Sequence, residues 1–140
     1  MPRRMLCGVA LCIALWTAAG LAEDPVEIGK AVPAAQQWLA LVDQGRYGDS
    51  WNAAAGYFQE IVPQHQWEQS LQAVRTPLGR MLTRTVLRTK YATTLPGAPD
   101  GHYVIIQFKT SFEHKQSAIE TVTPMIDKDG RWRVSGYFIR

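Results

Sequence analysis

The hydrophobic pattern of this chain changes its period at Gly79, and this change constrains the fold more than any other feature. Between residues 31 and 75, apolar residues recur at three- and four-residue steps, which is typical of helices with one buried face. After Gly79 they alternate with polar residues, which is typical of strands in a half-buried sheet. The sequence therefore predicts an α+β fold, with helices first and an antiparallel sheet after them.

Glycine and proline divide the helical half into segments. The first helix is expected to begin near Pro33, because proline fits a first turn, and to stop at Gly45. Asp49 can cap a second helix, and a third is expected over residues 64–75. The side chains predicted to face inward are Ala31, Ala35, Trp38, Val42, Trp51, Ala54, Ala55, Trp67, Leu71 and Val74.

Four strands are expected in the second half. Residues 82–92 are rich in Thr, Val, Leu and Tyr, and residues 102–112 show the clearest alternation. A reversal at residues 113–115 leads to a third strand over residues 116–126, and a hairpin turn at residues 127–130 leads to the last. In that last strand we expect Trp132, Val134 and Phe138 on one face, with Tyr137 and Ile139 opposite.

Residues 1–22 have the order of a secretory signal peptide. Arg3 and Arg4 precede an uncharged apolar run over residues 6–21, and small residues follow just before Glu23. The run is slightly shorter than the ~20 residues of a spanning helix. We therefore expect cleavage, no stable membrane anchor afterwards, and a periplasmic or secreted protein.

The mature chain would be a single domain over residues 23–140. Cys7 and Cys12 both lie in the leader, and neither follows a small residue as a lipid-modified cysteine would. The domain must then be held together by its core, without disulfides. The net charge of +3 falls to +1 without Arg3 and Arg4, which gives no indication of a nucleic-acid partner.

Four segments carry a resemblance to a known family. They are WLALVDQGRYGDSW (residues 38–51), RTPLGRMLTR (75–84), LPGAPDGHYVIIQFKTSF (95–112) and DGRWRVSGYFIR (129–140). They resemble the exported bacterial proteins of domain-of-unknown-function family 4019. That resemblance implies a fold and an export route but no established activity, so no catalytic residue is carried over.

The order of elements is also similar to the cystatin-like, nuclear-transport-factor-like superfamily, in which helices pack in the concavity of a curved antiparallel sheet to form a cone. This superfamily includes ketosteroid isomerase and scytalone dehydratase. The resemblance implies a cone with an internal cavity, and dimerisation through the convex sheet face by analogy.

Glu120 is the candidate catalytic residue, because the enzymes of this superfamily perform acid–base chemistry inside the cone. A carboxylate in such an apolar strand could also form a structural ion pair with Arg84 or Arg88 of a neighbouring strand, and we favour this interpretation. The tyrosines considered beside it are Tyr57, Tyr91 and Tyr137.

A basic series offers a second kind of site. Arg80, Arg84 and Arg88 recur every four residues, with Lys90 close by, so a regular strand would place all four on one face. Such a face could bind an anionic ligand through bidentate contacts, although a solvated charged face is the default.

Three tryptophans lie on helix faces that should point at the sheet. Trp38 is expected in the core, whereas Trp51 and Trp67 could frame the mouth of a cavity. The three histidines, His65, His102 and His114, show no metal-binding spacing, and no cofactor motif is present. The predicted ligand-binding residues are Trp51, Tyr57, Trp67, Arg84 and Tyr137.

The leading hypothesis is a non-catalytic module with an apolar pocket. It would bind a small apolar or anionic ligand, an envelope protein or a second copy of itself. The alternative is a small cavity enzyme of isomerase or dehydratase type that uses Glu120.

Overall fold

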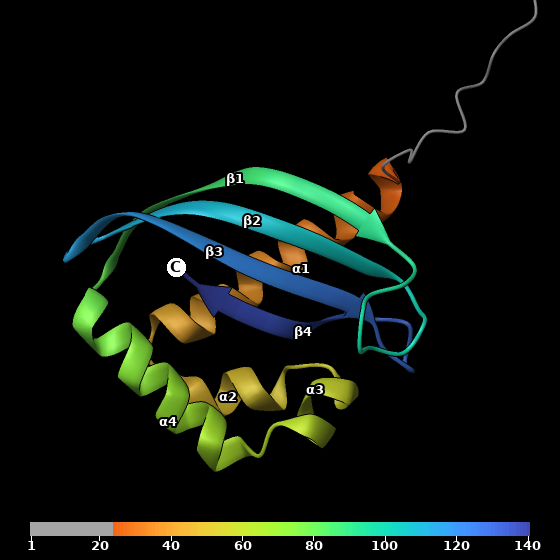
Figure 1. The fold of residues 1–140 in the computed structure, drawn as a ribbon, viewed down its shortest axis with the longest axis horizontal. Coiled ribbons are helices and arrows are strands. Elements are labelled where there is room, and N and C mark those ends of the chain that lie inside the picture. The colour runs from red at the N-terminus through yellow and green to blue at the C-terminus, as the bar shows by residue number, and fades with distance from the viewer. Residues whose placement is uncertain (1–23) are drawn as a thin grey trace, which may run out of the picture.

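A four-stranded antiparallel sheet, in the order β1-β2-β3-β4, curves around helix α1 in the computed structural model, which describes residues 24–140 (Figure 1). The helices are α1 (Pro25–Asp43), α2 (Tyr47–Asn52), α3 (Gly56–Ile61) and α4 (Gln64–Arg75), followed by a 3₁₀ turn over Thr76–Leu78. The strands are β1 (Met81–Ala92), β2 (Tyr103–Phe112), β3 (Lys115–Ile126) and β4 (Trp132–Ile139). The α+β prediction is confirmed, and the arrangement is cone-like.

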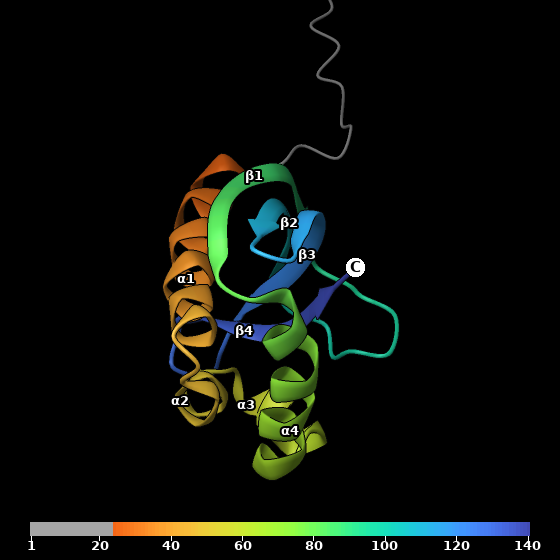
Figure 2. The ribbon, with the colours of Figure 1, turned by 90° about the vertical axis from the view of Figure 1, so that its left-hand side faces the viewer.

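Figure 2 shows how the layers are arranged. Helix α1 runs along one side of the curved sheet, and the short helices with α4 lie below edge strand β4. The core lies between these helices and the concave sheet face. Its largest buried side chains include Leu39, Val104, Ile106, Phe108 and Val122.

Helix α1 begins earlier than predicted. The Asp24 carboxylate accepts hydrogen bonds from the backbone amides of Val26 and Glu27, and Pro25 occupies the first turn. Pro33 therefore lies inside the helix, so the predicted start was wrong. The capped first turn and the burial of the apolar face hold the helix together despite the missing Pro33 amide. Its predicted end is confirmed, since Gly45 follows with a φ of 74°.

The other helical predictions are confirmed in part. Helix α4 occupies residues 64–75 as predicted, with Trp67 and Leu71 buried, but Val74 is 42% exposed. Asp49 does not cap α2. It lies within the first turn, and its carboxylate accepts a hydrogen bond from Arg46 Nε at 2.8 Å.

Bulges interrupt both edge strands and decide which side chains face the core. Opposed residues of an antiparallel pair share a face, and one extra residue moves all the following side chains to the other face. The register shifts in β1 lie between Met81 and Thr83 and between Val86 and Arg88, and β4 has one extra residue between Val134 and Tyr137.

In β1 the second bulge separates the basic residues. Arg84 lies opposite Thr110, on the concave face, whereas Arg88 and Lys90 lie beyond the bulge on the outer face. Arg80 precedes the strand, and its side chain forms an ion pair with Glu113. The prediction that all four basic side chains share one face was therefore wrong.

In β4 the bulge changes the face of the sheet to which the last side chains of the strand point. Tyr137 and Ile139 lie opposite Val122 and Glu120, on the concave face together with Val134. Phe138 is turned outward and is 56% exposed. The predicted assignment of these faces was wrong, because it assumed an uninterrupted alternation.

No helix within residues 24–140 is both long and apolar enough to span a membrane. The predicted signal peptide, residues 1–22, lies outside the described residues.

Candidate functional site

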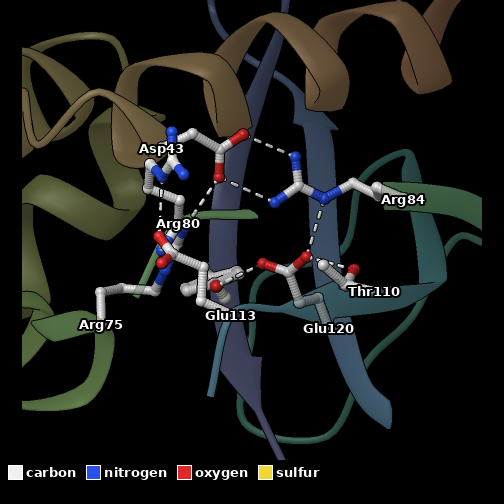
Figure 3. Close-up of polar contacts among 8 residues, drawn as sticks. Asp43, Arg75, Arg80, Arg84, Thr110, Glu113 and Glu120 are labelled. Carbon is white, nitrogen blue, oxygen red and sulfur yellow. Dashed lines mark hydrogen bonds and ion pairs between the residues drawn. The ribbon is translucent and has the colours of Figure 1, made fainter. Parts of the chain in front are cut away.

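Four charged side chains meet inside the cone, and we refer to them as the buried charge cluster: Asp43, Arg75, Arg84 and Glu120 (Figure 3). Asp43 and Arg75 are the last residues of α1 and α4, so the ends of these two helices bring them together. Arg84 comes from β1 and Glu120 from β3. The two positive and two negative charges balance, which is the condition under which burial of ions is tolerated.

Arg84 lies at the centre of the cluster. Its Nη1 and Nη2 atoms donate to Asp43 at 2.7 and 2.9 Å, and its Nε donates to Glu120 Oε1 at 2.7 Å. A guanidinium in this bidentate arrangement fixes both its own orientation and that of its partners. Because the arginine bridges two carboxylates, it ties the end of α1 to the sheet.

Glu120 is fully buried and is held by three side chains. Arg84 and the Thr110 hydroxyl donate to Oε1, and the Tyr137 hydroxyl donates to Oε2 at 2.5 Å. The expected ion pair is present with Arg84 and not with Arg88, and it reaches across the intervening strand β2. Arg84, Thr110 and Tyr137 lie on β1, β2 and β4, so Glu120 on β3 links side chains from all four strands of the sheet.

Arg75 completes the cluster from α4. Its Nη2 donates to Asp43 Oδ1 at 2.8 Å, and its guanidinium carbon lies 4.8 Å from the centre of the Phe112 ring, a cation–π contact. Burial raises the pKa of the Asp43 carboxyl, but the hydrogen bonds and charges of Arg84 and Arg75 outweigh burial and hold that pKa below its ordinary value. Asp43 is therefore ionised at neutral pH.

The pH dependence of stability should show the contribution of Asp43. Its folded-state pKa is lowered from 3.8, so its stabilisation is fully present above that pH and is lost as the pH falls through the folded-state pKa. Urea midpoints of the wild type and of Asp43→Asn should therefore differ near neutral pH, begin to approach each other below about pH 4, and meet only below the folded-state pKa of Asp43. Asp49→Asn, which changes a half-exposed ion pair, is the control and should show little difference at any pH. A difference in urea midpoint between Asp43→Asn and the wild type that stays the same at every pH would contradict this assignment.

A small groove lies next to the cluster, between α4 and the end of β4, and we call it the α4/β4 groove. Its volume is about 190 Å³, and its lining residues are Trp67, Ser70, Leu71, Val74, Tyr137, Phe138 and Ile139. Tyr137 belongs to both features, because its ring lines the groove while its hydroxyl contacts Glu120. Burial and the Glu120 charge raise the pKa of the Tyr137 phenol, so it is protonated at neutral pH.

The structure brings two of the five predicted ligand-binding residues together. The rings of Trp67 and Tyr137 have centroids 6.4 Å apart, and both line the α4/β4 groove. Arg84 belongs to the buried charge cluster. Trp51 and Tyr57 have local roles instead: Trp51 Nε1 donates to the Val62 carbonyl at 2.8 Å, and the Tyr57 hydroxyl donates to the Gly97 carbonyl at 3.0 Å.

Sequence reasoning missed Asp43 and Arg75. A signal was present for both, because Arg75 continues the helical spacing of Trp67 and Leu71, and Asp43 lies four residues after buried Leu39. A charge on a buried helix face predicts an internal partner. Among the described residues, no group of three or more histidine, cysteine, aspartate or glutamate side chains is arranged so that it could bind a metal ion.

Comparison with known proteins identifies the family of this chain. A family model described as "Protein of unknown function (DUF4019)" matches residues 34–137, most of the chain. The matched region includes the whole buried charge cluster and Tyr137. No curated protein matches the chain.

Proposed function

Because the chain belongs to the DUF4019 family, whose function is unknown, its role must be inferred from its own residues, and we propose that it is a non-catalytic binding module. The observation that carries the proposal is an exposed apolar rim above a fixed aromatic floor in the α4/β4 groove. The leader sequence supports a location in the cell envelope or outside it.

The rim of the α4/β4 groove is apolar and open to solvent. Val74 is 42% exposed and Phe138 is 56% exposed, although both are large hydrophobic side chains. Among the described residues that line the groove, Ser70 has a short polar side chain, and the polar atoms of Trp67 and Tyr137 are already engaged with Ser50 and Glu120. Exposed apolar side chains gathered around a concave site mark contact surfaces.

The volume of the groove limits what can enter it. At about 190 Å³ it is smaller than the roughly 300–1,000 Å³ pockets that enclose whole small molecules. It is closer to an apolar cavity of about 150 Å³, which holds one benzene ring. We therefore propose that the occupant is one aromatic or aliphatic side chain of a protein partner.

The floor of the groove is held in place before any partner arrives. Trp67 Nε1 donates to the Ser50 hydroxyl at 3.0 Å, and the Tyr137 hydroxyl is fixed on Glu120. Preorganised side chains lose little entropy on binding, which favours affinity for a partner. In this proposal the buried charge cluster supports the binding surface instead of performing chemistry.

The alternative function, a cavity enzyme using Glu120, has one contact in its favour. Tyr137 could connect a substrate in the groove with the Glu120 carboxylate, because it touches both. An acid or base must however reach the proton it transfers. Both Glu120 oxygens accept hydrogen bonds from side chains, and Glu120 is not among the residues that line the groove, so the geometry favours the binding module.

Selection from a displayed random-peptide library would test the proposal. Peptides enriched on the wild-type protein should share one large apolar anchor residue. They should lose binding to Val74→Lys, which places a charge on the rim, and keep binding to Val26→Lys, which alters an exposed valine on α1 outside the groove. Peptides without such an anchor, or with equal binding to both variants, would contradict the proposal.

A further inference from the structure

A second groove lies between α1 and the beginning of β4, and we call it the α1/β4 groove. Its volume is about 420 Å³, and its lining residues are Ala34, Gln37, Trp38, Leu41, Ala53, Arg131, Trp132, Arg133 and Val134. It shares no lining residue with the α4/β4 groove. We propose that it binds a small planar organic anion, such as an aromatic carboxylate.

The inner wall of this groove is apolar. Trp38 and Val134 are 4% and 2% exposed, and they form its buried side. The Trp38 indole N–H already donates to the Ser50 carbonyl at 2.8 Å, so this indole offers only apolar ring surface. Two small residues, Ala34 and Ala53, leave room beside it. This wall suits a flat apolar ring.

The outer wall carries two arginine side chains. Arg131 and Arg133 line the groove, and no acidic side chain does. Arg133 is already engaged, because its Nη2 lies 2.6 Å from Asp129 Oδ2 and its Nε lies 3.6 Å from Asp127. The Arg131 side chain is 78% exposed, and its Nε is 4.0 Å from the same Asp129 oxygen. Arg131 thus keeps donors free for an incoming carboxylate, which it can bind bidentately.

Two further polar groups lie on the wall without a protein partner. Within the described residues, the Trp132 indole N–H and the Gln37 amide take part in no hydrogen bond, whereas the indoles of Trp38, Trp51 and Trp67 each donate to an oxygen. Both side chains remain accessible to solvent. A few unengaged polar groups around an apolar wall are typical of small-molecule sites.

The volume and the chemistry point to the same class of ligand. About 420 Å³ lies within the range of roughly 300–1,000 Å³ found for small-molecule sites. A ring against Trp38 and Trp132 would be buried, and a carboxylate at its edge would meet Arg131. A neutral ring would lose the charged contact, and a simple inorganic anion would lose the apolar one.

The test uses 1-naphthoate as the probe and 1-naphthamide, its neutral analogue, as the matched ligand. Both are titrated into ¹⁵N-labelled protein while the indole N–H signals are followed by NMR. Millimolar naphthoate should shift the Trp132 signal and leave the Trp51 signal in place, because Trp51 lies outside the groove. Naphthamide should bind more weakly, and added salt should weaken the binding of naphthoate but not that of naphthamide.

Two arginine variants supply the control. Arg131→Gln should raise the Kd for naphthoate about 3- to 10-fold, the range expected for an exposed charge-assisted contact. It should leave the Kd for naphthamide unchanged. Arg88→Gln removes an exposed arginine from the outer face of β1 and should change neither value. Both variants are surface changes, so folding is retained.

Three outcomes would overturn the inference. The first is an unmoved Trp132 signal at millimolar naphthoate. The second is equal affinity for the charged and neutral probes, which would show an apolar surface without an anion site. The third is an equal effect of Arg131→Gln and Arg88→Gln, which would show nonspecific attraction to positive charge. None of these results bears on the α4/β4 groove, so the two proposals can fail separately.

Discussion

Replacing Glu120 with alanine is expected to lower the free energy of unfolding by about 3–5 kcal/mol, the cost of removing one partner from a buried ion pair. The change would leave the Arg84 Nε, the Thr110 hydroxyl and the Tyr137 hydroxyl without their shared acceptor in a dry interior. It would also leave two buried arginines facing the single remaining carboxylate of Asp43. We expect this to be among the most damaging single substitutions in the domain.

Urea denaturation followed by tryptophan fluorescence would measure the effect. Glu120→Gln is the second variant to measure, because it keeps the shape of the side chain and can keep hydrogen bonds to its neighbours but removes the charge. It should therefore lose less unfolding free energy than Glu120→Ala. Glu113→Ala breaks the exposed ion pair with Arg80 and is the matched control, with a midpoint close to that of the wild type. Equal midpoints for Glu120→Ala and Glu113→Ala would show that the cluster does not stabilise the fold.

The same variants separate the two candidate functions. If Glu120 supports the binding surface, Glu120→Gln should keep most of its affinity for the selected peptides. The amide oxygen can still accept from Arg84 and Thr110, and the Tyr137 hydroxyl can accept a hydrogen bond from the amide nitrogen. If Glu120 is instead an acid or base, the amide should abolish turnover of any substrate while the fold stays intact.

Replacing Trp38 with alanine is expected to cost about 3–5 kcal/mol, because it removes a large aromatic side chain from the core and leaves a cavity. Trp38 lies where α1 meets both the sheet and α4. Its ring centroid is 5.4 Å from that of Tyr137 and 6.1 Å from that of Trp67, and its N–H donates to the Ser50 carbonyl. The substitution would therefore loosen the inner walls of both grooves at once.

Trp38→Phe separates packing from hydrogen bonding in this cluster. It keeps most of the aromatic contacts and leaves only the Ser50 carbonyl without its donor. We therefore expect the free energy of unfolding to fall by about 1–3 kcal/mol. Urea midpoints for both variants, with near-ultraviolet circular dichroism as a check on aromatic packing, would measure the difference. A loss for Trp38→Ala no larger than that for Trp38→Phe would contradict the central position of this ring.

Local patterns predicted most of the secondary structure. Helix α4 was predicted over residues 64–75 and is found there, and β2 was expected over residues 102–112 and covers Tyr103–Phe112. The spacing of apolar residues and the glycine and proline at the boundaries depend only on residues close together in the sequence. They can therefore be recognised without the tertiary structure. The fold class followed from the order of these segments, because each must bury its apolar face against another.

The same local rules failed wherever a bulge or a distant contact decided the outcome. Alternation placed Phe138 on the same face as Val134 and Tyr137 on the opposite face, but the extra residue in β4 put Tyr137 with Val134 instead. Alternation also put Arg84 and Arg88 on one face, and the bulge in β1 separated them. A bulge depends on how one strand fits its partner and the core, so a single strand does not reveal it.

The candidate sites depend still more on tertiary structure. The amino-acid sequence determined that Glu120 lies in an apolar strand and that Trp67 faces the core. Only the fold placed Asp43, Arg75, Arg84 and Glu120 in one cluster, with Tyr137 beside Trp67 at the groove. The physical reason is that a buried charge is stabilised by an opposite charge close to it in three dimensions. Here those charges come from the ends of α1 and α4 and from β1 and β3, which are not neighbours in the sheet.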